Sequence, residues 1–307
     1  MKNLTENEVQ ALEEKAYTIR KLCLEFITNA GWGHIGGSFS QAEILACLYH
    51  HVLRIDPQQP DEPTRDLFVL SKAHASPALY ATLAMRGFIP MERLSSYCRL
   101  HGLDGHTQRG QCPGIEYSGG SLGTGLSFAV GAALGLRLKD NLQSRVFCLI
   151  GDGECNEGQI WEALMSAAHY RLDNLIAIVD YNKVMAKGKM SDLMSIEPLR
   201  EKLASFGWTV LEIDGHDVRE ICGAFYRAKY LEMNGRPVAV IAHTVKGRGI
   251  PECEFNHRWH THAPQAKQAE AFLAALNRQT GRHGAFSGPL REPKDGGLQA
   301  VVEEALS

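Results

Sequence analysis

The sequence predicts an α/β protein with a doubly wound, mostly parallel β-sheet and helices on both faces. Short apolar runs of strand length alternate with segments of helical periodicity. Most of these runs are apolar at successive positions, which is typical of strands that helices cover on both sides. The runs lie at 65–71, 145–150, 175–180, 208–214 and 238–244.

Helical periodicity marks several of the segments between the strands. The first expected helix spans 8–30 and ends at Gly31; its apolar face consists of Leu12, Ala16, Ile19, Leu22, Cys23 and Phe26. A second helix is expected over 40–53, with Ser40 as N-cap and Glu43 three residues later completing a capping box. Further helical segments are 76–87, closed by Gly87, and 127–139.

The composition is that of an ordinary globular chain. Of its 307 residues, 44% are hydrophobic and 22% are charged, and the net charge is −3. The chain therefore has no basic field that would hold nucleic acid, and no apolar run approaches the ~20 residues that cross a membrane. The eight cysteines form no C-x-x-C pair. Together with a start, Met1 to Gln10, that does not resemble a signal peptide, this favours a cytoplasmic location.

We expect one ligand-binding domain over residues 1–270. Residues 271–307 are expected to form a C-terminal helix and tail, which we interpret as a tail or an interface arm. Within it, the segment 298–306 has a helix-like pattern.

Two polar residues follow neighbouring strands of the expected sheet. Asp152 comes directly after the run at 145–150, within a Gly-Asp-Gly turn, and Asn182 follows the run at 175–180. A right-handed crossover places both strand ends at the same edge of the sheet, which is where open α/β sheets bind ligands. Carboxylate and amide oxygens suit magnesium or calcium. A backbone carbonyl just after Asn182, such as that of Val184, is expected to supply a third ligand.

The glycines of the turn indicate which anion this metal would hold. Gly151 and Gly153 let the backbone turn sharply and approach a phosphate, and the following helix directs its positive end toward the same place. The sequence therefore predicts a diphosphate bridged by a divalent metal.

Gly-Asp-Gly followed about thirty residues later by Asn matches the thiamine diphosphate signature, and the chain resembles transketolases at this point. The resemblance covers about the first 265 residues. Six further segments match in the family's order: "GWGHIGGSFSQAE", "SKAHASPALYATL", "LDGHTQ", "SGGSLGTGLSFAVGAALG", "WTVLEIDGHD" and "HTVKGRG…WHTHAP". The resemblance implies the thiamine-diphosphate-binding fold, and specifically its diphosphate-binding module, for residues 1–270.

The resemblance also implies roles for individual residues. The implied cofactors are thiamine diphosphate and Mg²⁺, with Ca²⁺ or Mn²⁺ as substitutes. The implied metal ligands are Asp152, Asn182 and the Val184 carbonyl. The implied cofactor contacts are His74, Leu122, Gly123, Gly151, Asp152, Gly153, Asn182 and His260. The implied catalytic residues are His34, His106, His260 and Glu157, the last at a subunit interface.

At three positions the chain departs from the family pattern. Thr124 stands where Gln is usual, Lys187 where Asp is usual, and Thr261 where Gly is expected after His260. The segment "HRWHTH" also places three imidazoles close together, so either His257 or His262 could take the role of His260.

Simpler interpretations exist for each motif. Gly31, Gly33 and Gly36 fit G-x-G-x-x-G, but they follow a helix instead of the strand that a dinucleotide site requires. Zinc binding by the "HRWHTH" histidines lacks a Cys or carboxylate at ligand spacing. Asp152 alone could be a helix N-cap, and Asn182 alone a turn residue. The paired strand ends and the flanking glycines favour the metal site.

Thiamine chemistry needs a glutamate that transketolases carry on a second, pyrimidine-binding domain. The resemblance does not extend to such a domain, so we expect the active site to form with a second transketolase subunit, in a heterotetramer. The expected reaction is transfer of a two-carbon ketol unit from a ketose, a sugar phosphate or related salvage sugar, to an aldose. The alternatives are the alpha subunit of a thiamine-dependent 2-oxoacid dehydrogenase and a non-catalytic regulatory homologue.

Overall fold

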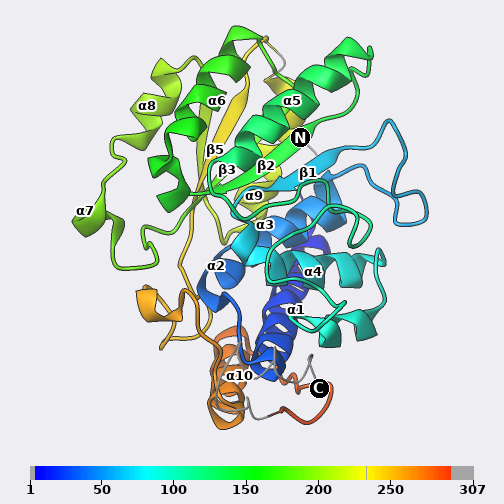
Figure 1. Cartoon of the computed structure of the whole chain (residues 1–307), viewed down its shortest axis with the longest axis vertical. Helices are drawn as coiled ribbons and strands as arrows, with labels where there is room; N and C mark the ends of the chain where they lie inside the picture. The colour runs from blue at the N-terminus through cyan, green and yellow to red at the C-terminus, as the bar shows by residue number, and fades with distance from the viewer. Residues whose placement is uncertain (1–3, 233, 292–307) are drawn as a thin grey trace.

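A five-stranded parallel β-sheet forms the centre of the chain, with strand order β1-β2-β3-β5-β4 (Figure 1). The computed structural model describes residues 4–232 and 234–291. Each pair of neighbouring strands runs parallel. The strands are β1 (Leu67–Leu70), β2 (Val146–Gly151), β3 (Leu175–Tyr181), β4 (Thr209–Asp214) and β5 (Val238–His243). They coincide with the five predicted apolar runs.

Helices cover both faces of this sheet, as predicted (Figure 1). The core on one face is shared with α3 (Ala42–Cys47) and α9 (Val218–Tyr226), and α1 (Glu6–Ala30) and α4 (Ser76–Arg86) extend it by packing on α3. The other face packs against α5 (Thr124–Leu138), α6 (Gly158–His169) and α8 (Leu199–Ser205). The shorter helices α2 (Ile35–Ser40) and α7 (Met190–Leu193) lie in the loops, and α10 (Ala266–Thr280) packs beside α1.

Alternation along the strands divides the interior into two cores. In β2, Phe147 and Leu149 enter the core on the side of α3 and α9, whereas Val146, Cys148 and Ile150 enter the core beneath α5 and α6. Successive side chains of a strand point to opposite faces, so a strand covered on both sides must be apolar throughout. This burial is the physical origin of the continuous apolar runs.

The first helix has the predicted position, while the second differs from the prediction. Helix α1 ends at Ala30, and Gly31 adopts the left-handed conformation at its C-cap. The predicted capping box of Ser40 and Glu43 is wrong. Ser40 is the last residue of α2, and its hydroxyl donates to the buried Asp180 carboxylate (2.6 Å), while Glu43 pairs with Arg20. Buried charged partners bind these side chains more strongly than a local cap would.

The expected continuous helix over 40–53 is also interrupted. Helix α3 covers Ala42–Cys47, and a π-helical turn, Leu48–Val52, completes the segment. The helix expected at 127–139 starts earlier, at Thr124, because Gly123 supplies a left-handed residue (φ 86°) at its N-cap. The helix expected at 76–87 is α4, and Gly87 closes it as predicted.

The chain after α10 lies along α1. Tyr17 donates a hydrogen bond to Asn277 Oδ1 (2.5 Å), the Ser287 amide donates to the Glu25 carboxylate (3.1 Å), and the Arg291 amide donates to Asn29 Oδ1 (2.8 Å). Helix α10 spans Ala266–Thr280 and so continues through the domain boundary expected at residue 270. The helix-like segment 298–306 lies outside the described residues.

Among the helices that the structure describes, none combines the length and the apolar character needed to cross a bilayer.

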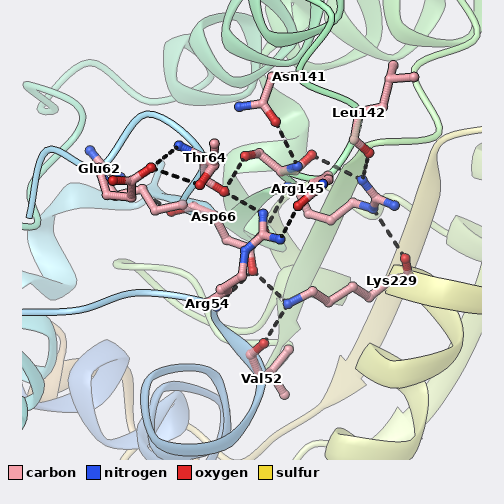
Figure 2. Close-up of polar contacts among 12 residues, drawn as sticks. Val52, Arg54, Glu62, Thr64, Asp66, Asn141, Leu142, Arg145 and Lys229 are labelled. Carbon is pink, nitrogen blue, oxygen red and sulfur yellow. Dashed lines mark hydrogen bonds and ion pairs between the residues drawn. The ribbon is translucent and has the colours of Figure 1, made fainter. Parts of the chain in front are cut away.

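A buried charge network holds the amino-terminal ends of β1 and β2 (Figure 2). The fully buried Asp66 carboxylate accepts hydrogen bonds from the amides of Arg54 (2.8 Å) and Arg145 (2.9 Å) and from Lys229 Nζ (2.6 Å). Lys229 also donates to the Val52 carbonyl (2.7 Å). Asp66 thereby links the first strand to the helical segment after α9.

We predict that Asp66→Asn lowers the free energy of unfolding by about 3–5 kcal/mol, because it leaves the Lys229 ammonium buried without its counter-charge. Urea denaturation measures this change. The matched control is Asp61→Asn, the same change at an exposed turn nearby, which should alter stability by less than about 0.5 kcal/mol. Equal effects of the two substitutions would contradict a special role for Asp66.

Candidate functional site

A pocket of about 160 Å³ lies at the carboxyl ends of β2 and β3. It collects residues from the strand ends and from loops far apart in the sequence. Its lining comprises Gly37, Lys72, His74, Leu122, Gly151, Asp152, Gly153, Glu154, Asn182, Val184, Met185, Ala186, Lys246 and His260. All of the cofactor and metal residues expected from the sequence are in this set, except Gly123, whose amide is hydrogen-bonded to Glu154.

The three expected metal ligands lie on adjacent turns. Asp152 follows β2 and is 3% exposed; its carboxylate accepts hydrogen bonds from the amides of Gly153 (2.6 Å) and Lys183. Asn182 follows β3, and its side-chain oxygen accepts from the Val184 amide (3.1 Å). The crossover therefore brings Asp152 and Asn182 to one sheet edge, as the strand pattern predicted.

The charge at this edge suits a cation. Burial and the neighbouring Asp180 raise the pKa of Asp152 to about 6, even though two backbone amides and Lys246 oppose the rise. The Val184 carbonyl accepts a hydrogen bond from Lys246 Nζ (2.6 Å), so a positive group already contacts this oxygen. A carboxylate, an amide oxygen and a carbonyl are hard ligands, and this donor set fits Mg²⁺.

A buried ion pair that the sequence reasoning missed supports the ligand turns. Lys72 donates to the Asp180 carboxylate and to the Gly37 carbonyl (2.9 Å), and both charged side chains are almost fully buried. Burial alone would raise the pKa of Asp180, but the Lys72 ammonium and its hydrogen bonds hold it below its usual range. Asp180 also accepts from Asn182 Nδ2 (3.2 Å). The sequence did contain a signal for this ion pair: Asp180 is a charged residue at the end of an otherwise apolar strand segment.

Glu154 joins the two glycine turns of the pocket. Its buried carboxylate accepts hydrogen bonds from the amides of Gly123 (2.8 Å) and Gly151 (2.9 Å) and from the Ser71 hydroxyl (2.5 Å). A Cβ atom at Gly123 would lie 2.8 Å from Glu157 Cβ, and the φ of 86° also favours glycine there. Glu154 was not among the expected site residues.

The four histidines expected from the family resemblance form one cluster. The ring centre of His34 lies 5.1 Å from that of His74, 5.8 Å from His106 and 5.4 Å from His260. His34 Nδ1 is buried without a hydrogen-bond partner in the described part of the chain. Buried polar atoms are usually hydrogen-bonded, so this ring nitrogen has the capacity for a further hydrogen bond.

The structure distinguishes the three imidazoles of "HRWHTH". His260 lines the pocket, and Lys246 Nζ donates to its Nδ1 (3.0 Å). His262 is exposed and its ring packs on Trp259 (4.9 Å between ring centres), while His257 is exposed. His260 is thus the one whose ring lies next to those of His34 and His74.

Burial favours the neutral form of these histidines. Burial, reinforced by His106 and Lys246, lowers the pKa of His34 to about 4, and burial together with Lys246 lowers the pKa of His260 to about 3. Burial also lowers the pKa values of His74 and His106. Neutral imidazoles can both donate and accept hydrogen bonds, which suits them to bind hydroxyl groups and move protons.

The remaining expected residues lie at the rim. Glu157 is exposed at the N-cap of α6, beside Gly123, and Leu122 is 36% exposed. Thr124 bonds to the Tyr117 hydroxyl, while Lys187 and Thr261 are exposed.

The fold and the pocket define an α/β domain that places carboxylate, lysine and histidine groups around a pocket at the carboxyl edge of its sheet. The family model described as "Transketolase, thiamine diphosphate binding domain" matches residues 12–283. The chain therefore belongs to the transketolase family and carries its thiamine diphosphate-binding domain. The family and the fold predicted from the sequence are confirmed.

Several relatives are similar over nearly their whole length. The chain is 43% identical over 269 residues to the 6-deoxy-6-sulfo-D-fructose transketolase subunit SqwG of Clostridium sp. (strain MSTE9), covering 87% of this chain and 97% of that one. It is 39% identical over 273 residues to a subunit of the apulose-4-phosphate transketolase of Phocaeicola vulgatus, covering 89% and 96%. These relatives do not favour the 2-oxoacid dehydrogenase alternative.

A solved structure extends the comparison to a longer transketolase. The enzyme from Campylobacter jejuni superposes with a TM-score of 0.83 at 30% identity, covering 97% of this chain and 48% of that one. The chain thus spans about half the length of this transketolase.

The depressed pKa of His34 predicts a pH-dependent loss of stability. As pH falls from about 6.5 toward about 4, the unfolded chain binds a proton on this imidazole while the folded chain does not, so stability declines. His34→Gln removes this titration. The unfolding free energy of the variant should therefore fall less steeply with decreasing pH than that of the wild type, and the two slopes should differ by up to about 1.4 kcal/mol per pH unit. Urea denaturation at about pH 7 and about pH 5 measures the difference. Parallel declines in both proteins would refute the prediction.

Proposed function

We propose that this chain is the cofactor-binding subunit of a two-subunit transketolase, which holds Mg²⁺-thiamine diphosphate and transfers a two-carbon ketol unit from a ketose to an aldose. One observation carries this proposal. Asp152, Asn182 and Val184 line one pocket at the carboxyl edge of the sheet, beside a cluster of histidines.

Each group in the pocket has a proposed role in holding the cofactor. Asp152, Asn182 and the Val184 carbonyl would hold the metal, and Gly151 and Gly153 would let the backbone approach the diphosphate. Lys246, which lines the pocket, would add positive charge. Bound thiamine diphosphate supplies the nucleophilic carbon that this chain's side chains lack.

The histidines are proposed to act on the sugar. His34 Nδ1 is buried and unpartnered within the described residues, so a substrate hydroxyl would satisfy it. His106 lies beside it and next to Trp32. His74 and His260 face the pocket and would contact both diphosphate and substrate. Neutral rings can pass a proton between hydroxyl and carbonyl oxygens.

The substrate class is inferred from the relatives. Two of them are named for 6-deoxy-6-sulfo-D-fructose and apulose-4-phosphate, sugars that carry an anionic sulfo or phosphate group. We propose a ketose with such a group for this chain as well.

A partner chain is proposed to complete the site, because these relatives are named as subunits. The proposed docking face is the outer side of α5 and α6, next to the rim residues Leu122 and Glu157. Phe128, Leu138 and Met165 are exposed there, and Gly131 and Gly135 leave open space along α5. Exposed apolar residues around small ones allow a second chain to approach closely.

We propose that this partner carries the pyrimidine-binding domain with the activating glutamate, that the assembly is a heterotetramer, and that residues 271–307 add an interface arm. A cytoplasmic location is also proposed, which the eight free cysteines support.

We predict that Asp152→Asn weakens Mg²⁺-dependent binding of thiamine diphosphate by about 100-fold, because the site loses its charged ligand. Titration calorimetry with and without Mg²⁺ measures this. Asp192→Asn, on the exposed surface of α7, is the matched control and should bind normally. Unchanged magnesium dependence in Asp152→Asn would remove this residue from the metal site.

The proposed function is tested by assaying ketol transfer with this chain alone, with its partner alone and with both, in saturating Mg²⁺ and thiamine diphosphate. We expect turnover from the mixture and at least about 100-fold less from either chain. Appreciable turnover by this chain alone would overturn the two-subunit proposal.

The docking face predicts a steric block. Gly131→Trp should prevent assembly and activity, because Gly131 lies on the proposed face. Gly223→Trp is the control and should permit both, because Gly223 lies on α9, away from that face. A Cβ atom meets no neighbouring atom within 4 Å at either position, so the chain itself has room for both substitutions. Sedimentation and activity are the measurements. Normal assembly of Gly131→Trp would exclude this face.

A further inference from the structure

A histidine outside the pocket connects two features of the interior: a buried ion pair and the segment that bears Lys246. His216 follows β4, and its side chain is 9% exposed. Its Nδ1 lies 2.9 Å from Glu43 Oε2, and its Nε2 accepts a hydrogen bond from the Val245 amide (2.8 Å). One imidazole thus bridges the helical layer and the loop after β5.

These two contacts fix the tautomer of His216. The Val245 amide is a donor, so Nε2 must present a lone pair to it. The Glu43 carboxylate is an acceptor, so the proton must be on Nδ1. The neutral Nδ1–H tautomer satisfies both partners, and a ring with the opposite tautomer would satisfy neither.

The ion pair of Arg20 and Glu43 holds the carboxylate that sets this tautomer. Arg20 donates from both terminal nitrogens to Glu43 (2.6 Å each), and both side chains are at least nine-tenths buried. Arg20 also donates to the Phe39 carbonyl (2.9 Å). A forked, buried pair of this kind fixes the position of the carboxylate. His216 therefore binds to a rigid point in the helical layer.

The other end of the bridge lies next to a pocket residue. Val245 precedes Lys246, whose Nζ contacts the Val184 carbonyl (2.6 Å) and His260 Nδ1 (3.0 Å). Contacts on either side hold the same segment: Thr244 donates to Asp180, and the Gly247 amide donates to the Gly36 carbonyl (3.1 Å). The imidazole of His216 is the partner of the Val245 amide between them.

The geometry points to His216 as a positioning residue for the cofactor site: through the Val245 amide it holds Lys246 against the Val184 carbonyl and His260. This inference rests on the proposed function, because it assigns the effect to binding of Mg²⁺-thiamine diphosphate. His216 itself would contact neither cofactor nor sugar. Supporting residues of this kind typically change affinity by about 10–100-fold.

The test is a double-mutant cycle on cofactor affinity. Binding of Mg²⁺-thiamine diphosphate by the full chain is measured by calorimetry for the wild type, His216→Leu, Lys246→Met and the double variant. We expect His216→Leu to weaken binding about tenfold in the wild-type background and less than about twofold when Lys246 is already Met. His216→Gln, which keeps one donor and one acceptor, should bind within about threefold of the wild type.

Thermal unfolding of each variant separates positioning from folding. If His216→Leu does not fold, His216→Asn, whose shorter amide cannot reach both partners, replaces it in the cycle. Equal losses of affinity in both Lys246 backgrounds, or a lowered melting temperature with unchanged affinity, would overturn the inference. A wild-type chain that binds no cofactor would instead overturn the proposed function, so the two failures are distinguishable.

Discussion

The site depends on one buried negative charge, that of Asp180. Its carboxylate, at the carboxyl end of β3, accepts hydrogen bonds from Lys72 after β1, Ser40 of α2 and Thr244 after β5. A carboxylate with no exposed surface is tolerated only when it is paired and fully hydrogen-bonded. Meeting that requirement forces three separate chain segments to converge at one sheet edge. The pocket lies between these segments, at the carboxyl ends of the strands.

A second carboxylate, Glu154, applies the same constraint to the glycine turns. By accepting from the Gly123 and Gly151 amides, it fixes the loop before α5 against the turn after β2. Burial lowers the pKa values of the lysine and the histidines around these two carboxylates. The pKa of Lys246 falls to about 8 because it is buried, although Asp152 opposes this effect, and the clustered histidines remain neutral. A site with charged oxygen donors on one side and uncharged imidazoles on the other can bind an anion through a metal while handling protons.

Local patterns in the sequence determined much of the fold and part of the site. The five strands were predictable because a strand buried on both faces must be apolar throughout, and the C-caps at Gly31 and Gly87 because glycine readily adopts the left-handed conformation. Asp152 and Asn182 were predictable because parallel topology brings successive strand ends together. The family resemblance, and no local pattern, identified the four clustered histidines.

Only the tertiary structure decided where the buried polar side chains find their partners. Ser40 and Glu43 have the spacing of a capping box, yet they bind Asp180 and Arg20, because a charged partner in a buried environment outweighs a local backbone amide. The path of the loop decides that His260, and neither His257 nor His262, lines the pocket, and sequence spacing does not determine that path. The sequence by itself thus determined the strands, the turns and the chemistry available at their ends, which follow from nearest neighbours and periodicity. The pairing of Lys72, Glu154, His216 and Lys246 with distant groups required the folded chain, since each partner is brought into contact by packing and not by sequence separation.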